Sequence, residues 1–65
     1  MMSRVKEIMF YVFKDGKALD RQVGFLYNTG DMNYKNNKQE KLDRLMAEYP
    51  ESEGYKLCVN YERTL

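Results

Sequence analysis

Side chains that commonly carry out catalysis are scarce in this sequence, and those present do not form a catalytic motif. Histidine is absent, and Cys58 is the only cysteine. A reactive thiol needs a nearby cation or helix start to lower its pKa. Lys56 could supply that cation, but the apolar neighbours Leu57 and Val59 favour a packing role for Cys58. The carboxylates are scattered over turns and polar faces, without the pairing that acid–base catalysis needs. We therefore predict that the protein is not an enzyme.

A metal centre, an internal disulfide and a bound cofactor are not expected either. One cysteine without histidine cannot complete a closed zinc site, and a single thiol has no partner within the chain. An unpaired cysteine is also typical of reducing compartments. No apolar segment reaches the roughly 18 residues of a membrane span. We expect no membrane partner and a cytoplasmic location, which for a viral protein is the host cytoplasm.

One polar segment, residues 33–39, has residue types suited to binding another macromolecule. Within it, Tyr34, Asn36, Asn37 and Lys38 combine an aromatic ring, two amides and one charge. Because such side chains make adaptable hydrogen bonds at interfaces, they are candidate partner-binding residues. The alternative is a loop followed by the first turn of a helix, with an asparagine at the N-cap.

The charge of the chain disfavours a nucleic-acid partner. Lysine and arginine number 11 and aspartate and glutamate 10, which gives a net charge of +1. Nucleic-acid-binding domains are usually strongly basic. Lys38, Lys41 and Arg44 recur every three residues and predict a short basic ridge, but Glu40 and Asp43 lie beside it. A weakly basic RNA- or DNA-binding module is therefore a minor alternative.

The first half of the chain has the composition of a β-hairpin. Residues 4–13 are rich in β-branched and aromatic types, and residues 18–27 alternate between apolar and polar types. Between them, Asp15-Gly16 is a strong signal for a tight turn. Gly24, inside the second strand, predicts a bulge.

The second half of the chain predicts a helix and then a third strand. The helix should begin near residues 35–37, and it should end at Pro50, because the residue before a proline is pushed out of the helical region. Its apolar residues recur at helical spacing: Leu42, Leu45, Met46 and Tyr49. Residues 55–62 alternate as a strand, with one apolar face made of Tyr55, Leu57, Val59 and Tyr61.

These elements predict one α+β domain over residues 1–65. A hairpin followed by a helix and a strand gives β-β-α-β order, and the simplest sheet has strand order 2-1-3. Its three strands are antiparallel, and the helix packs on one face. The predicted core consists of Ile8, Phe10, Val12, Leu19, Val23, Phe25, Leu42, Leu45, Met46, Leu57 and Val59.

The first strand is apolar on both faces, and one helix can cover only one of them. Ile8, Phe10 and Val12 suit the covered face, which leaves Met9, Tyr11 and Phe13 on the other. Aromatic residues and methionine are enriched at interfaces, so these three are further candidate partner-binding residues. The alternatives are partial shielding by lysine and glutamine side chains and a homodimer formed through this face.

The order of elements, with several short matches, resembles the Dmd antitoxin family of T-even-type bacteriophages. The matches are Val5-Lys6, Phe13-Lys14, Arg21-Gln22-Val23, a helix with Leu45 and Tyr49, and a last strand with Lys56-Leu57-Cys58-Val59. The family has a tryptophan near the helix entrance that helps to hold the toxin, whereas this chain has Tyr34 in the comparable region and no tryptophan.

The resemblance implies a partner and a mechanism. Members of the family block host ribonuclease toxins of the RNase LS type by direct protein contact. We therefore expect a small phage-type inhibitor that occludes a host protein without covalent chemistry. The alternative function, of a different class, is that of a homo-oligomeric accessory protein.

Overall fold

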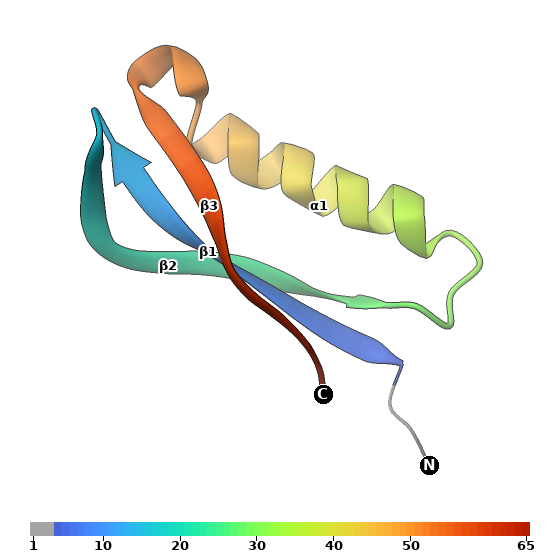
Figure 1. Cartoon of the computed structure of the whole chain (residues 1–65). Coiled ribbons are helices and arrows are strands. Elements are labelled where there is room, and N and C mark those ends of the chain that lie inside the picture. Colours follow the sequence, from blue (N-terminus) through green and yellow to red (C-terminus); the bar gives the residue numbers. More distant parts are fainter. Residues whose placement is uncertain (1–3) are drawn as a thin grey trace.

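The computed structural model describes residues 4–65, which form one sheet and one α-helix (Figure 1). In chain order the elements are β1 (Val5–Lys14), β2 (Lys17–Asn28), α1 (Tyr34–Glu48), the 3-10 helix η1 (Glu51–Glu53) and β3 (Tyr55–Thr64). β1 is the central strand of the order β2-β1-β3 and is antiparallel to both neighbours. The predicted α+β fold, strand order and helix are therefore confirmed.

The turn between β1 and β2 is the tight hairpin that the sequence predicts. Asp15 and Gly16 have φ values of 52° and 81°, the left-handed conformation that a two-residue hairpin turn requires. The turn also contacts the other end of the chain, because the Asp15 amide donates a 2.9 Å hydrogen bond to the carbonyl of Gly54. This bond fixes the tip of the hairpin beside the start of β3.

The irregularity in β2 does not lie at Gly24, so the predicted position of the bulge is wrong. Gly24 pairs in register with Met9, and the register shifts between Tyr11 and Phe13 instead. Gly24 has a different role, since a Cβ atom there would collide with the backbone carbonyl of Ile8 and the sulfur of Met9. The glycine lets the Met9 side chain lie close against β2.

A second irregularity, in β3, reverses which side chains of that strand point to each face of the sheet. Tyr61 pairs with Met9 and Val59 pairs with Phe10, so Asn60 is an extra residue between them. Because side chains alternate along a strand, the extra residue moves Tyr61 to the face that Met9 occupies. The prediction that Tyr61 shares a face with Val59 is therefore wrong.

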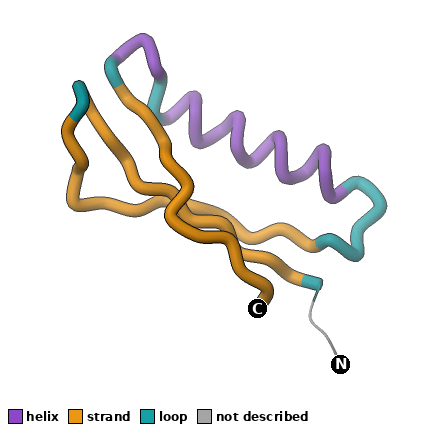
Figure 2. The backbone as a smooth tube through the Cα atoms, in the orientation of Figure 1, coloured by secondary structure: helices purple, strands orange, loops and turns teal. Residues whose placement is uncertain are grey.

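The core lies between α1 and one face of the sheet (Figure 2). Among residues 4–65, the buried hydrophobic side chains are Ile8, Phe10, Val12, Tyr27 and Tyr49. Val23, Phe25, Leu42, Leu45 and Leu57 are partly buried against this cluster, together with Tyr34. Eight of the eleven predicted core residues are therefore in the core, three of them buried and five partly buried.

Three residues of the predicted core are exposed, and the prediction is wrong for them. Leu19, Met46 and Val59 have exposed fractions of 37%, 51% and 60%. Leu19 follows the hairpin, where β2 departs from regular pairing with β1, and Val59 lies on the outer strand β3. A single helix is too narrow to cover the whole width of the sheet.

The loop before α1 is organised by Asp31. Its Oδ1 atom accepts a 2.9 Å hydrogen bond from the amide of Asn33, and its carbonyl accepts one of 3.1 Å from the amide of Tyr34. Asn33 occupies the N-cap position but makes no side-chain capping bond. The helix therefore starts slightly earlier than the predicted range of 35–37.

Candidate functional site

The side of the sheet that faces away from α1 is the main candidate site, and we call it the open face. On β1 it contains Met9, Tyr11 and Phe13, which alternate with the buried residues Ile8 and Phe10. Within residues 4–65, no helix or loop packs over this side of the sheet (Figures 1 and 2). The three candidates from β1 are therefore brought together on one uncovered surface.

Residues of the outer strands extend this apolar surface. Tyr61 and Cys58 of β3 pair with Met9 and Tyr11 respectively, and Leu26 of β2 lies on the same side of the sheet. The exposed fractions of Tyr11, Leu26 and Tyr61 are 41%, 45% and 36%, whereas Met9 and Phe13 are half-buried. On the central strand, Tyr11 is thus the most accessible of the three candidates.

Polar groups surround the apolar centre of the open face. Asn60 Nδ2 donates a 3.0 Å hydrogen bond to Gln22 Oε1, which links the two outer strands across β1. Glu7 Oε1 accepts bonds of 2.9 Å from the Tyr61 hydroxyl and from Arg63 Nε. The bond to Glu7 raises the pKa of Tyr61 above its ordinary value. The charge of Glu7 is therefore already paired, as it is in the polar rim of many interfaces.

The other predicted binding residues lie on the opposite side of the sheet, around the start of α1. The ring of Tyr34 stacks on that of Tyr27, with centroids 6.4 Å apart and an interplanar angle of 14°. Asn37 Nδ2 donates to Asp31 Oδ2 at 3.4 Å, and Asn36 is exposed. The candidates thus form two separate groups, and the side chains of the second group are largely engaged in internal contacts.

Lys38 belongs to a small cluster that links α1 to the sheet. Its Nζ atom lies 3.4 Å from Glu62 Oε2 and 4.8 Å from the centroid of the Tyr27 ring. Burial by itself raises the pKa of Glu62, but hydrogen bonds from Tyr27 and Lys38 outweigh it and leave the pKa below its ordinary value. Desolvation raises the pKa of Tyr27. This cluster therefore serves to join the elements.

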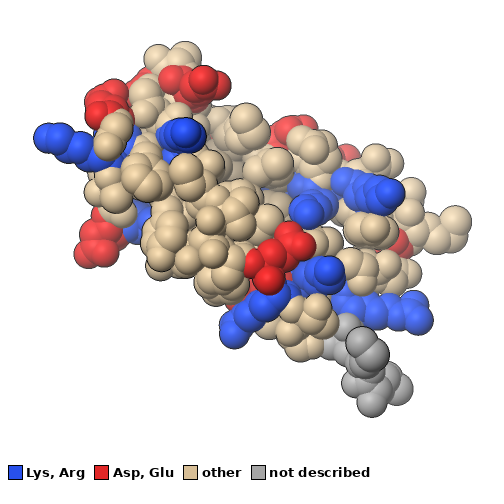
Figure 3. Space-filling model, viewed as in Figure 1, with Lys and Arg blue, Asp and Glu red and all other residues tan. Residues whose placement is uncertain are grey.

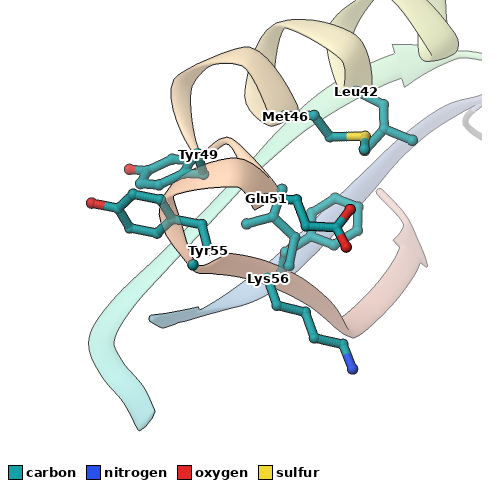
Figure 4. Close-up of a pocket in the computed structure, with 9 residues that line it drawn as sticks. Leu42, Met46, Tyr49, Glu51, Tyr55 and Lys56 are labelled. Carbon is teal, nitrogen blue, oxygen red and sulfur yellow. The ribbon is translucent and has the colours of Figure 1, made fainter. Parts of the chain in front are cut away.

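A groove lies between the C-terminal half of α1 and the start of β3 (Figure 4). It has a volume of about 550 Å³. Its walls are mostly apolar, with Glu51 and Lys56 as the charged members. The lining consists of Phe10, Leu42, Met46, Tyr49, Glu51, Gly54, Tyr55, Lys56 and Leu57. Sequence reasoning missed this groove, because it forms between two elements and no local pattern describes it.

Metal-binding and membrane-spanning features were also sought within residues 4–65. In this range, no three cysteine, aspartate or glutamate side chains come close enough to hold a metal ion. The same residues contain no helix with the length and apolarity needed to cross a membrane. Searches of family models, curated proteins and solved structures returned no match to the chain.

Proposed function

We propose that the chain is a small inhibitor that binds another protein through the open face and occludes it without a chemical step. The observation that carries the proposal is the row of Met9, Tyr11 and Phe13 on the central strand, over which no helix or loop of residues 4–65 packs and in which Tyr11 is exposed. Contiguous apolar patches on small proteins commonly mark contact sites.

The total exposed area supports a binding role. The chain has an accessible surface of 5062 Å², whereas a typical monomer of its mass, 7.8 kDa, exposes roughly 4,400 Å². The surplus of several hundred Å² is comparable in scale with the roughly 800 Å² that each partner buries in an interface of standard size.

The composition of the open face suits a protein partner. Tyr11 and Tyr61 are of the residue type that most often contributes large binding energies, and Met9 can adapt to an irregular surface. The hydrogen bonds of Glu7 and Gln22 satisfy polar groups around this centre. An apolar centre with a satisfied polar rim is the usual anatomy of an interface.

The resemblance to Dmd antitoxins supports a more specific form of the proposal, in which the bound protein is a host ribonuclease toxin. Inhibition then requires that the sheet cover the surface with which the toxin binds RNA. Because occlusion is stoichiometric, each molecule of the chain neutralises a fixed amount of toxin and is not turned over.

An RNA-cleavage assay with a toxin of the RNase LS type tests this proposal. We expect cleavage to fall linearly as the chain is added and to stop at a fixed molar ratio. Tyr11→Lys places a charge in the centre of the open face and should weaken inhibition by about 30-fold, the usual effect at a strong contact residue. Circular dichroism checks that the variant is folded.

The matched control is Met32→Lys, since Met32 lies outside the open face and is 99% exposed. This variant should inhibit as well as the original chain. Full cleavage in the presence of excess folded chain would refute the ribonuclease form of the proposal. Inhibition that both Tyr11→Lys and Phe13→Lys leave unchanged would remove the open face from the contact.

A further inference from the structure

We propose that two copies of this chain pair through their β3 strands, antiparallel and about a two-fold axis at Cys58, so that the two sheets join into one. The inference concerns an edge of the sheet, and it does not depend on the inhibitory role of the open face. Three observations carry it: the unpaired backbone groups of β3, an exposed valine beside a groove-lining leucine, and the position of the cysteine.

β3 is an outer strand whose outward backbone groups have no partner. The hydrogen bond from the Asp15 amide to the Gly54 carbonyl fixes the alternation along the strand. Cys58 therefore faces β1, whereas the amides and carbonyls of Leu57 and Val59 face away from the sheet. Within the part of the chain that the structure describes, no other group bonds to them. A row of free donors and acceptors of this kind fits an extended strand.

The two edges of the sheet are not equally accessible. At the β2 edge, Lys41 Nζ donates a hydrogen bond to the carbonyl of Leu26, and α1 packs more closely on β2 than on β3. Residues 57–60 of β3 contain none of the charged residues that usually protect an edge strand. Uncharged side chains form a continuous area along β3 in the space-filling view (Figure 3). Pairing through one edge of each copy gives a closed dimer.

The free groups of β3 determine the position of the two-fold axis. An axis at Cys58 places Leu57 of each copy opposite Val59 of the other, so both residues exchange their amide and carbonyl bonds. An axis at Leu57 would instead pair Val59 with Tyr55. The amide of Tyr55 already donates to the carbonyl of Pro50 at 3.4 Å. The axis at Cys58 is therefore the one that uses only unoccupied groups.

The side chains fit the same register. Val59 is 60% exposed, and Leu57, on the same side of the sheet, lines the groove between α1 and β3. Residues directly opposite each other in a sheet have Cβ atoms roughly 5 Å apart, so Val59 of each copy covers Leu57 of the other at the open side of the groove. Lys56 lies opposite Asn60 of the other copy, and like charges do not meet.

The axis also places the two Cys58 side chains directly opposite each other. Because the backbone of Cys58 faces β1, the two residues form a pair without hydrogen bonds, in which Cα atoms lie about 4.5 Å apart. This separation is within the range that a disulfide can span. Cys58 is a free, half-buried thiol. Oxidation should therefore link the two copies covalently.

Cross-linking with copper phenanthroline tests the register. Two thiols form one S–S bond and release two protons and two electrons, which the copper oxidant accepts, and a gel without reductant should show a covalent dimer. The matched control combines Cys58→Ser with Lys56→Cys, which moves the thiol two positions along the same side of β3. Its two thiols would lie roughly 13 Å apart along the strands, so cross-linking should be lost.

Sedimentation velocity with reductant present tests the dimer itself. We expect a reversible dimer. Val59→Lys should raise its dissociation constant by about 30-fold, because a charge then faces Leu57 and the contact occurs twice. Val59 is exposed, so this variant should keep its fold, which circular dichroism checks. Tyr11→Lys, on the open face, should leave the dimer intact.

Several outcomes would overturn the inference. A chain that stays monomeric at high micromolar concentration would do so, as would equal cross-linking of the original chain and the control with the displaced thiol. A dimer that Val59→Lys leaves unchanged, or that Tyr11→Lys dissociates, would exclude the β3 edge as the contact.

Discussion

Gly24 is the residue at which the sheet has least room for an added atom. Its missing side chain leaves space for the carbonyl of Ile8 and the sulfur of Met9. Gly24→Ala should therefore lower the free energy of unfolding by about 2 kcal/mol, the usual cost of overpacking. Urea denaturation measures the difference.

Gly30→Ala is the matched control for this prediction. The atom nearest to the Cβ that it adds is Cδ of the long side chain of Arg4, which can move aside. The cost at Gly30 should be clearly smaller than at Gly24. Equal costs at the two positions would mean that the close approach of Met9 to β2 is unimportant for stability.

Glu62 should make the stability of the protein depend on pH below the ordinary range of carboxyl titration. Its pKa in the folded state lies below the ordinary value of 4.5 because Tyr27 and Lys38 stabilise the carboxylate. The stabilisation is therefore complete above pH 4.5 and is lost as the pH falls through the lowered pKa. Unfolding curves at neutral and acidic pH measure this loss.

The variant Glu62→Gln provides the comparison for the pH dependence. It should be less stable than the original chain at neutral pH, because Lys38 loses its charged partner. The difference between the two proteins should shrink as the pH falls through the lowered pKa. A difference that stays constant over this range would contradict the assigned role of the carboxylate.

At the scale of elements, the first turn of α1 is stabilised by the loop before it and not by a side-chain cap of its own. Asp31 holds the amide of Asn33, and α1 has no side-chain capping bond at its N-cap. Asp31→Ala should cost about 1 kcal/mol of stability, similar to the loss of a capping residue. Amide hydrogen exchange in the first turn of α1 should accelerate in parallel.

Asp31→Asn keeps the acceptor for the Asn33 amide but removes the charge and the oxygen that accepts from Asn37 Nδ2. The amide oxygen can still accept the bond from Asn33, so most of the stability should return. If Asp31→Asn is as unstable as Asp31→Ala, the charge of Asp31 and its bond from Asn37 matter more than its bond from the Asn33 amide. Thermal unfolding of the two variants side by side distinguishes these cases.

The strands, the hairpin and the helix could be predicted from the sequence because each depends on local residue types. Asp15 and Gly16 determine the turn by their own conformational preferences. The two irregularities in the sheet could not be predicted, because a bulge depends on which residue the neighbouring strand presents. Tyr61 was therefore assigned to the wrong face, although the strand that contains it was identified.

At the scale of the whole molecule, the burial of individual side chains could not be predicted fully because the molecule is thin. The Cα atoms extend over 42 × 20 × 11 Å, and the radius of gyration of 13.1 Å exceeds the roughly 11 Å typical of this length. Alternation correctly placed Ile8, Phe10 and Val12 towards the helix, but it could not show that Val59 lies beyond the cover of α1. The row of Met9, Tyr11 and Phe13 was identifiable because its strand is apolar on both faces.

The two borders of the sheet differ in a way that limits how many chains can join. Arg4 and Thr29 form a hydrogen-bonded pair, so by alternation the carbonyl of Leu26 points away from β1. Lys41 Nζ donates a 2.5 Å hydrogen bond to this carbonyl. A strand of another chain that paired with β2 would have to displace this ammonium group. Fibril growth by strand addition needs an unpaired strand at both edges of the sheet. It is therefore hindered at the β2 edge.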